Sequence, residues 1–253
     1  MPHSSTERFS SRVDNYVRYR PGYPQEVIEL LKTDCGLTSD SIVADIASGT
    51  GIFSKLLLEN GNPVFGVEPN AKMRSAGEEY LAAFPIFTSI AGTAEATTLG
   101  THSVDFVTAA QAAHWFNLAE ARKEFLRILK PGGWVVLLWN ERRIDFNPFL
   151  RDYEQLLLAY ATDYKEVRHE QTTKTIHGFF SPGKVQSRIF ETTQYLDYAA
   201  LQGRLLSSSY APPADHRNHE PMLKELQRIF DATNVNGQIA MEYNTLVYYS
   251  QLT

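Results

Sequence analysis

The sequence predicts an α/β fold built on one doubly wound sheet of seven mostly parallel strands, with an antiparallel edge strand. Short apolar segments alternate with helical patterns between residues 41 and 140, which is typical of a parallel sheet covered by helices on both faces. One buried segment near residue 45 leads directly into a glycine turn and then a helix. Two further strand patterns after residue 188 complete the sheet.

The parallel part of the sheet is expected from five short segments. They are residues 41–46, 63–67, 86–90, 104–109 and 134–139. Apolar residues recur on one helical face between these segments, which predicts helices over 52–60, 70–84 and 118–129. Asn70 is the expected N-cap of the second helix. The third helix is expected to end at Lys130-Pro131-Gly132-Gly133, because proline cannot continue it and glycine allows a positive φ.

The chain after residue 140 is less regular. A helix is expected over 148–161, followed by an irregular polar segment over 163–187 that contains a Ser181-Pro182-Gly183 turn. We interpret 141–187 as an insertion over the sheet. Strands are predicted over 189–196 and 238–249, with a helix over 223–230 between them. The short connection favours antiparallel pairing at this edge.

The N-terminal segment predicts a short helix. Phe9, Val13, Tyr16 and Arg20 lie on one face of it, and it ends at Pro21. The helix either covers a ligand or packs on the outside of the core. The whole chain is expected to be one domain. Its parts are an N-terminal lid with the first helices (1–35), a ligand-binding core (36–140), the insertion (141–187) and the closing strands and helices (188–253).

Composition narrows the class of protein. With 253 residues and 43% hydrophobic residues, the chain can form one ordinary globular unit. Its longest purely apolar segment, 134–139, is far shorter than the ~20 residues of a membrane-spanning helix, and the N-terminus is too polar for a signal peptide. Cys35 is the single cysteine, and the net charge is −5. We therefore expect a cytoplasmic protein that acts on a small molecule, with no nucleic acid or membrane partner. Its oligomeric state is not predicted.

The glycine turn predicts the ligand site. Gly49 and Gly51 lack the Cβ atoms that would keep a ligand away from the main chain, and the helix that follows presents unpaired N–H groups. A dinucleotide fingerprint would place glycines where this chain has Ala47 and Ile52, which disfavours an NAD-dependent oxidoreductase. Glu68, at the end of the next strand, can accept both hydroxyls of a ribose.

Small residues at alternate positions follow an acidic residue in Asp45, Ala47, Gly49 and Gly51. This pattern resembles the first motif of class I S-adenosylmethionine-dependent methyltransferases, and other matched positions between 41 and 140 resemble their small-molecule, type 11 branch. The resemblance implies a Rossmann-like methyltransferase fold and S-adenosyl-L-methionine as the cofactor. It implies that the cofactor is bound by Asp45, Ala47, Ser48, Gly49, Gly51, Glu68, Pro69, Met73, Ala94, Glu95 and Gln111.

The segment 110–116 resembles the family motif that lies beside the transferred methyl group. It implies that His114 is the catalytic base if the acceptor is a hydroxyl or an amine, whereas a carboxylate acceptor needs no base. Trp115 and Phe116 are expected to contact the substrate, together with Tyr16 and Arg20 of the lid. Arg20 would then hold an acidic acceptor. Alternatively, His114 is a polar residue at a strand end, and the two aromatic residues belong to the core.

Two other interpretations stay open. A non-catalytic protein could bind S-adenosyl-L-methionine through the same residues, and a cyclopropane-forming relative would use the same cofactor on lipid alkenes. No basic amphipathic helix suited to a membrane surface supports the latter. Asp215, His216 and His219 have the spacing of a partial metal site, but no third credible ligand is nearby, so no metal is predicted.

Overall fold

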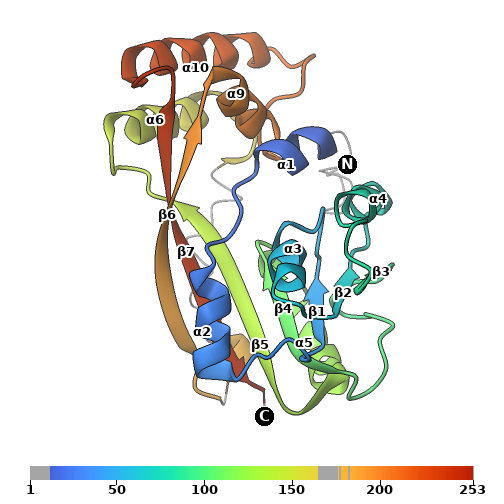
Figure 1. Cartoon of the computed structure of the whole chain (residues 1–253). Helices are drawn as coiled ribbons and strands as arrows, with labels where there is room; N and C mark the ends of the chain where they lie inside the picture. The colour runs from blue at the N-terminus through green and yellow to red at the C-terminus, as the bar shows by residue number, and fades with distance from the viewer. Residues whose placement is uncertain (1–11, 165–175, 177, 182, 253) are drawn as a thin grey trace.

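The computed structural model describes residues 12–164, 176, 178–181 and 183–252. Within this part of the chain, seven strands form one sheet in the order β3-β2-β1-β4-β5-β7-β6, with helices packed against it (Figure 1). Strands β1 to β5 pair in parallel. Strand β7 runs antiparallel to both of its neighbours, so the edge strand β6 pairs antiparallel with β7. The predicted doubly wound, mostly parallel sheet is confirmed.

The elements follow the predicted order along the chain. The strands are β1 Val43–Ile46, β2 Val64–Val67, β3 Phe87–Ile90, β4 Val104–Ala110, β5 Leu129–Arg142, β6 Gln186–Leu196 and β7 Ile239–Gln251. The helices are α1 Val13–Tyr19, α2 Glu26–Cys35, α3 Ile52–Glu59, α4 Ala71–Tyr80, α5 Leu118–Ile128, α6 Pro148–Tyr160, α9 Tyr198–Leu206 and α10 His219–Thr233, and Ala113–Trp115 forms one 3₁₀ turn, η1. None of the helices in the described ranges is long and apolar enough to cross a membrane.

Strand β5 differs from the prediction. It begins at Leu129, directly after α5, so the expected turn at residues 130–133 is an irregularity inside the strand. Leu129 pairs with Val104 of β4, whereas the next paired residue, Trp134, lies opposite Phe106. Glycine suits this irregularity because a Cβ at position 133 would lie 2.9 Å from the carbonyl oxygen of Asp105.

A second layer of helices surrounds the far ends of β6 and β7 (Figure 1). Helices α6, α9 and α10 bury apolar residues against one another and against these strands, including Leu157, Leu201, Leu226 and Met241. Helix α6 confirms the prediction for 148–161, and α10 is longer than the predicted 223–230. Helix α9 was not predicted. Most of the segment expected to be irregular, 163–187, lies outside the described residues, as does Pro182.

Helix α1 connects the two layers. It confirms the short N-terminal helix through Tyr16, although Phe9 lies outside the described residues. Helix α1 packs against both α9 and α4. Arg12, the residue before it, donates hydrogen bonds to the carbonyl oxygens of Ser208 and Ala211, which follow α9. The helix therefore crosses from the parallel sheet to the second layer.

Candidate functional site

Two adjoining cavities lie at the carboxyl ends of the parallel strands, where ligands bind in open α/β sheets. The larger has a volume of about 500 Å³ and the smaller about 220 Å³. Five residues line both of them: Tyr16, Ala47, Gly49, Ala110 and Gln111. The turn after β1 and the turn after β4 therefore form the boundary between the cavities.

The turn after β1 has an unusual backbone. Ala47, Gly49 and Gly51 have φ angles of 53°, 57° and 81°, all in the left-handed region. Gln111, after β4, has a φ of 59°. Positive φ is uncommon in residues other than glycine and is found preferentially at functional sites. Ala47 and Gln111 both line the two cavities, so this strained backbone lies where the cavities meet.

Asp45, on β1, is almost fully buried and lines the larger cavity. Its Oδ2 atom accepts a hydrogen bond from Ser54 Oγ at 2.6 Å, and Oδ1 accepts one from Thr108 Oγ1 at 2.9 Å. Burial raises the pKa of Asp45 to about 6, although these two hydrogen bonds lower it. A cationic ligand group beside this carboxyl would favour its ionised form.

Glu68 directly follows β2 and lines the smaller cavity. Its Oε2 atom accepts a hydrogen bond from the Gly49 N–H at 3.0 Å, and Oε1 accepts one from the Asn70 N–H at 2.7 Å. These bonds fix the carboxylate, and each oxygen retains a further lone pair for a ligand donor. Asn70 caps α4 as predicted, because its side chain accepts hydrogen bonds from the N–H groups of Lys72 and Met73.

The smaller cavity collects most of the residues predicted to bind the cofactor. It is lined by Glu68, Pro69, Met73, Ala94 and Glu95, besides the shared Ala47, Gly49 and Gln111. Asp45 and Ser48 line the larger cavity instead. Gly51 lines neither of the two, but its N–H donates to Ser48 O and closes the turn.

The aromatic residues of the 110–116 segment are placed differently from the prediction. Trp115 and Phe116 line the smaller cavity with Glu68 and Met73, not the larger cavity with Arg20. His114 is exposed on η1, with its ring 4.6 Å from that of Trp115, and it lines neither cavity. The tight η1 turn directs Trp115 to the cavity and leaves His114 at the surface, so the geometry gives no support to a base role for His114.

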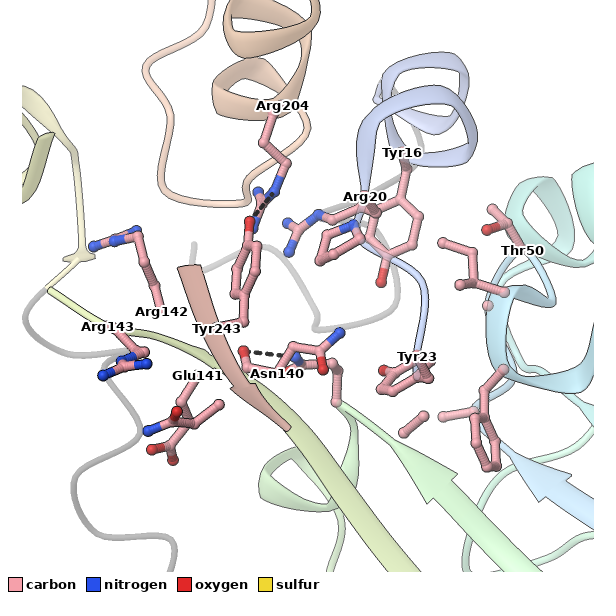
Figure 2. A pocket seen from close by; sticks show the side chains of 18 of the residues that line it. Tyr16, Arg20, Tyr23, Thr50, Asn140, Glu141, Arg142, Arg143, Arg204 and Tyr243 are labelled. Carbon is pink, nitrogen blue, oxygen red and sulfur yellow. Dashed lines mark hydrogen bonds between the residues drawn. The ribbon is translucent and has the colours of Figure 1, made fainter. Parts of the chain in front are cut away.

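The larger cavity is rich in arginine and tyrosine. Tyr16 and Arg20 line it, and so do three arginines and four tyrosines that the sequence analysis did not assign to a site: Arg142, Arg143, Arg204, Tyr23, Tyr164, Tyr210 and Tyr243. In Figure 2, Arg20 and Arg204 reach from different elements toward Tyr243. Arg204 Nε donates to Tyr243 OH at 3.3 Å. Arg20 Nε donates to Ser207 Oγ at 3.1 Å.

Only part of this arginine-rich wall had a signal in the sequence. Arg142 and Arg143 follow the apolar segment of the fifth strand after Asn140 and Glu141, and residues at that end of a parallel strand face the ligand site. Arg204 belongs to the helix that was not predicted. The two histidines with the spacing of a partial metal site, for which no metal was predicted, contact local main-chain groups: His219 Nδ1 lies 2.9 Å from Pro212 O, and His216 Nδ1 accepts from the Asn218 N–H.

Comparisons with known proteins agree with this geometry. A family model described as a methyltransferase domain matches residues 44–137. An uncharacterized methyltransferase of Mycobacterium tuberculosis is 40% identical, over 94% of this chain and 93% of the relative. A methyltransferase-like protein of Schizosaccharomyces pombe is 27% identical, over 96% of this chain and 94% of the relative.

Solved structures show the same fold. A proposed type II methyltransferase from Anaeromyxobacter dehalogenans superimposes with a TM-score of 0.71 at 22% identity, over 92% of this chain and 98% of that one. A proposed methyltransferase from an antibiotic biosynthesis pathway of Anabaena variabilis has a TM-score of 0.64 at 23% identity, over 96% and 100% of the two chains.

Proposed function

Because the chain belongs to the class I S-adenosylmethionine-dependent methyltransferases of type 11, we propose that it methylates a small molecule bound in its larger cavity. The observation that carries this proposal is the pair of cavities that meet at Ala47, Gly49 and Gln111. One cavity offers a fixed carboxylate and apolar walls, which suit a nucleoside. The other offers polar and charged side chains, which suit an acceptor.

The residues present fit S-adenosyl-L-methionine. Glu68 is held by two main-chain N–H groups and can accept the two ribose hydroxyls. Met73 and Ala94, both buried, supply apolar walls for an adenine ring. Gly49 leaves the main chain open to both cavities, and its φ of 57° is strained for other residues. Asp45 lines the larger cavity, where its carboxylate would attract the positive charges of the methionine part of the cofactor.

When bound, the cofactor would supply a methyl group attached to a sulfonium sulfur. An acceptor would bond to the methyl carbon, and the sulfur would leave as a thioether. The protein aligns the acceptor and excludes water. Gln111 is fixed for this purpose because its N–H donates to Leu138 O and its Nε2 donates to Asn140 O. Tyr16 lines both cavities from α1. Helix α1 therefore covers the place where the two ligands would meet.

Calorimetric titration of the purified protein tests the proposed cofactor. We expect micromolar binding of S-adenosyl-L-methionine and of S-adenosyl-L-homocysteine, because Glu68 and the glycine turn recognise the part that both molecules share. NAD is expected to produce no binding heat, because Ala47 and Ile52 replace the glycines of a dinucleotide site. Binding of NAD, with neither sulfur compound bound, would reverse the assignment.

Asp45 predicts a pH dependence of stability. Its pKa of about 6 lies above the ordinary 3.8, so the folded state binds the proton more tightly than the unfolded state. The contribution of this group to the free energy of unfolding is therefore greatest below pH 4. It falls by about 3 kcal/mol as the pH rises through 6. Asp45→Asn removes this loss. The free energy of unfolding of the variant is therefore expected to increase relative to that of the natural protein as the pH rises.

Urea denaturation at several values between pH 4 and pH 8 measures this difference. Asp40→Asn is the matched control, because Asp40 is exposed, and it should follow the natural protein at every pH. A stability difference between Asp45→Asn and the natural protein that stays constant from pH 4 to pH 8 would show that Asp45 does not titrate as expected.

A further inference from the structure

Three arginines converge on one side of the larger cavity, and we call Arg20, Arg142 and Arg204 the arginine cluster. They come from the C-cap of α1, the end of β5 and the last turn of α9. Arg204 is 7% exposed and the Arg142 side chain 10% exposed. Figure 2 shows Arg20 and Arg204 reaching toward Tyr243, whereas the Arg142 side chain, on β5, extends away from them. Three separate segments of the chain thus place arginines on the lining of one cavity.

The positive charge of the cluster is only partly balanced. Arg142 Nη2 pairs with Glu154 Oε2. Within the part of the chain that the structure describes, neither Arg20 nor Arg204 forms an ion pair. Arg20 donates to the side chain and the carbonyl oxygen of Ser207, and Arg204 to Tyr243 OH and Ser208 Oγ. Burying a charge without an opposite charge costs several kcal/mol. Arg204 is buried and Arg20 is half-buried, and neither guanidinium group has a counterion among the described residues.

The neighbouring groups respond to this charge. Burial and the Arg204 guanidinium both lower the pKa of Arg20. Burial raises the pKa of Tyr210, but Arg142, Arg204 and Arg20 lower it by more, so the pKa lies below the ordinary value. These shifts reflect in part the positive charge of neighbouring guanidinium groups, whereas nearby tyrosines raise the pKa of Arg204. An anion in the cavity would reduce the repulsion between Arg20 and Arg204.

A buried donor points to the same conclusion. Nε of Arg142 is buried and, among the described residues, has no hydrogen-bond acceptor. Buried polar groups are nearly always paired in folded proteins. Three acidic residues, Asp45, Glu141 and Asp145, also line the cavity. Figure 2 shows Glu141 on the side opposite Arg204, and among the described residues none of the three forms an ion pair with Arg20 or Arg204.

We propose that the acceptor is a small organic acid with two or more carboxylates, of which one is held by Arg20 and Arg204 and another receives the methyl group. This inference rests on the proposed function. Guanidinium groups bind carboxylates through paired, charge-assisted hydrogen bonds, and two unbalanced cations match a dianion. A carboxylate held by two arginines has its lone pairs engaged and is a poor nucleophile. The methyl group therefore goes to a second carboxylate.

The reaction needs no base. A lone pair on the free carboxylate oxygen forms the new bond to the methyl carbon. The carbon–sulfur bond breaks, and its electron pair stays on sulfur, so that the sulfonium becomes a neutral thioether and the carboxylate becomes a methyl ester. No proton is released. The reaction therefore agrees with the exposed position of His114 outside both cavities.

The carboxylate of S-adenosyl-L-methionine itself is another possible anion for these arginines, so the experiment separates the two sources. The natural protein, saturated with S-adenosyl-L-homocysteine, is titrated with succinate, glutarate, adipate and citrate. The monoamides of succinate and glutarate are the matched compounds. We expect at least one of the acids to bind 10-fold or more tightly than the monoamides. If none of the acids binds, or if the monoamides bind equally well, the proposal is overturned.

Arg204→Gln and Arg204→Lys then locate the acid. Acid binding is expected to weaken at least 30-fold in Arg204→Gln and less in Arg204→Lys, while the affinity for S-adenosyl-L-methionine changes less than 3-fold. Arg228→Gln, on the exposed face of α10, is the matched control and should bind as the natural protein does. A comparable loss of affinity for S-adenosyl-L-methionine in Arg204→Gln would assign the cluster to the cofactor and overturn the proposal.

The product gives a further readout. With methyl-labelled S-adenosyl-L-methionine and the acid that binds best, the label should appear in a product that releases volatile methanol in mild base, as a methyl ester does. Base-stable label would overturn the proposed ester. The two proposals fail in different ways. Binding of S-adenosyl-L-methionine without acid binding contradicts only the acceptor class, whereas acid binding without cofactor binding contradicts the methyltransferase function.

Discussion

Glu68→Ala is expected to weaken the binding of S-adenosyl-L-methionine about 100-fold, or about 2.7 kcal/mol. The change removes the carboxylate that would accept the ribose hydroxyls, and hydrogen bonds to charged groups contribute about 1.5 to 3 kcal/mol each. It also leaves the N–H groups of Gly49 and Asn70 without their acceptor. The glycine turn and the start of α4 are therefore less well fixed in the variant.

Calorimetry with the natural protein and the variant measures this loss, and a thermal melt shows whether the variant is folded. Glu79→Ala is the matched control, because Glu79 is exposed on the nearby helix α4 and its loss should leave the affinity unchanged. The affinity of Glu68→Gln should lie between that of Glu68→Ala and that of the natural protein, since the amide keeps one acceptor oxygen. An unchanged affinity in a folded Glu68→Ala variant would remove Glu68 from the cofactor site.

Gly203→Ala is expected to release helix α1 from helix α9. A Cβ at position 203 would overlap the ring of Tyr19, and overpacking of this kind typically costs 1–3 kcal/mol. Helix α1 has no fully buried residue, so it should move away while the sheet stays intact. Tyr16 lies on α1, and Arg20 is its C-cap. Since Tyr16 lines both cavities and Arg20 lines the larger one, both cavities would lose part of their lining.

Limited digestion with trypsin detects the release, since α1 carries the exposed Arg18. Cleavage after Arg18 should be about 10-fold faster in Gly203→Ala, which corresponds to about 1.4 kcal/mol of easier local opening. The melting temperature should fall by only a few degrees. Gly100→Ala, where a Cβ has room, should be cleaved as the natural protein is. Equal cleavage rates in the two variants would show that the contact between α1 and α9 does not hold α1 in place.

The turn after β1 and most of the lining of the smaller cavity were predictable, because the sequence patterns that indicate them are local. The strand, the glycine turn and the helix around Asp45 are consecutive in the chain, and the N-cap at Asn70 lies two residues beyond Glu68. Sequence period and turn residues report such short-range structure directly. Most of the predicted cofactor residues accordingly line one of the two cavities.

The lining of the larger cavity was predictable only in part, because it depends on contacts between distant segments. Arg204 lies in a short helix, α9. Glycine and arginine are not typical of a buried helix face, although Gly203 and Arg204 are both buried there. The approach of Arg204 to Arg20 follows from the packing of α1 on α9, which no local pattern reports. His114 shows a related limit. The motif gives its position in the chain, but the turn of η1 decides that its ring lies at the surface.

The two cavities are built from different stretches of the chain. The residues that line only the smaller one lie between Glu68 and Phe116, whereas the arginine cluster comes from the flanking segments, before β1 and after β4. Substitutions in these flanks can therefore accumulate without disturbing the strands that hold the donor. During divergence from a common ancestor, such a protein can change the molecule it modifies while it keeps the same source of methyl groups.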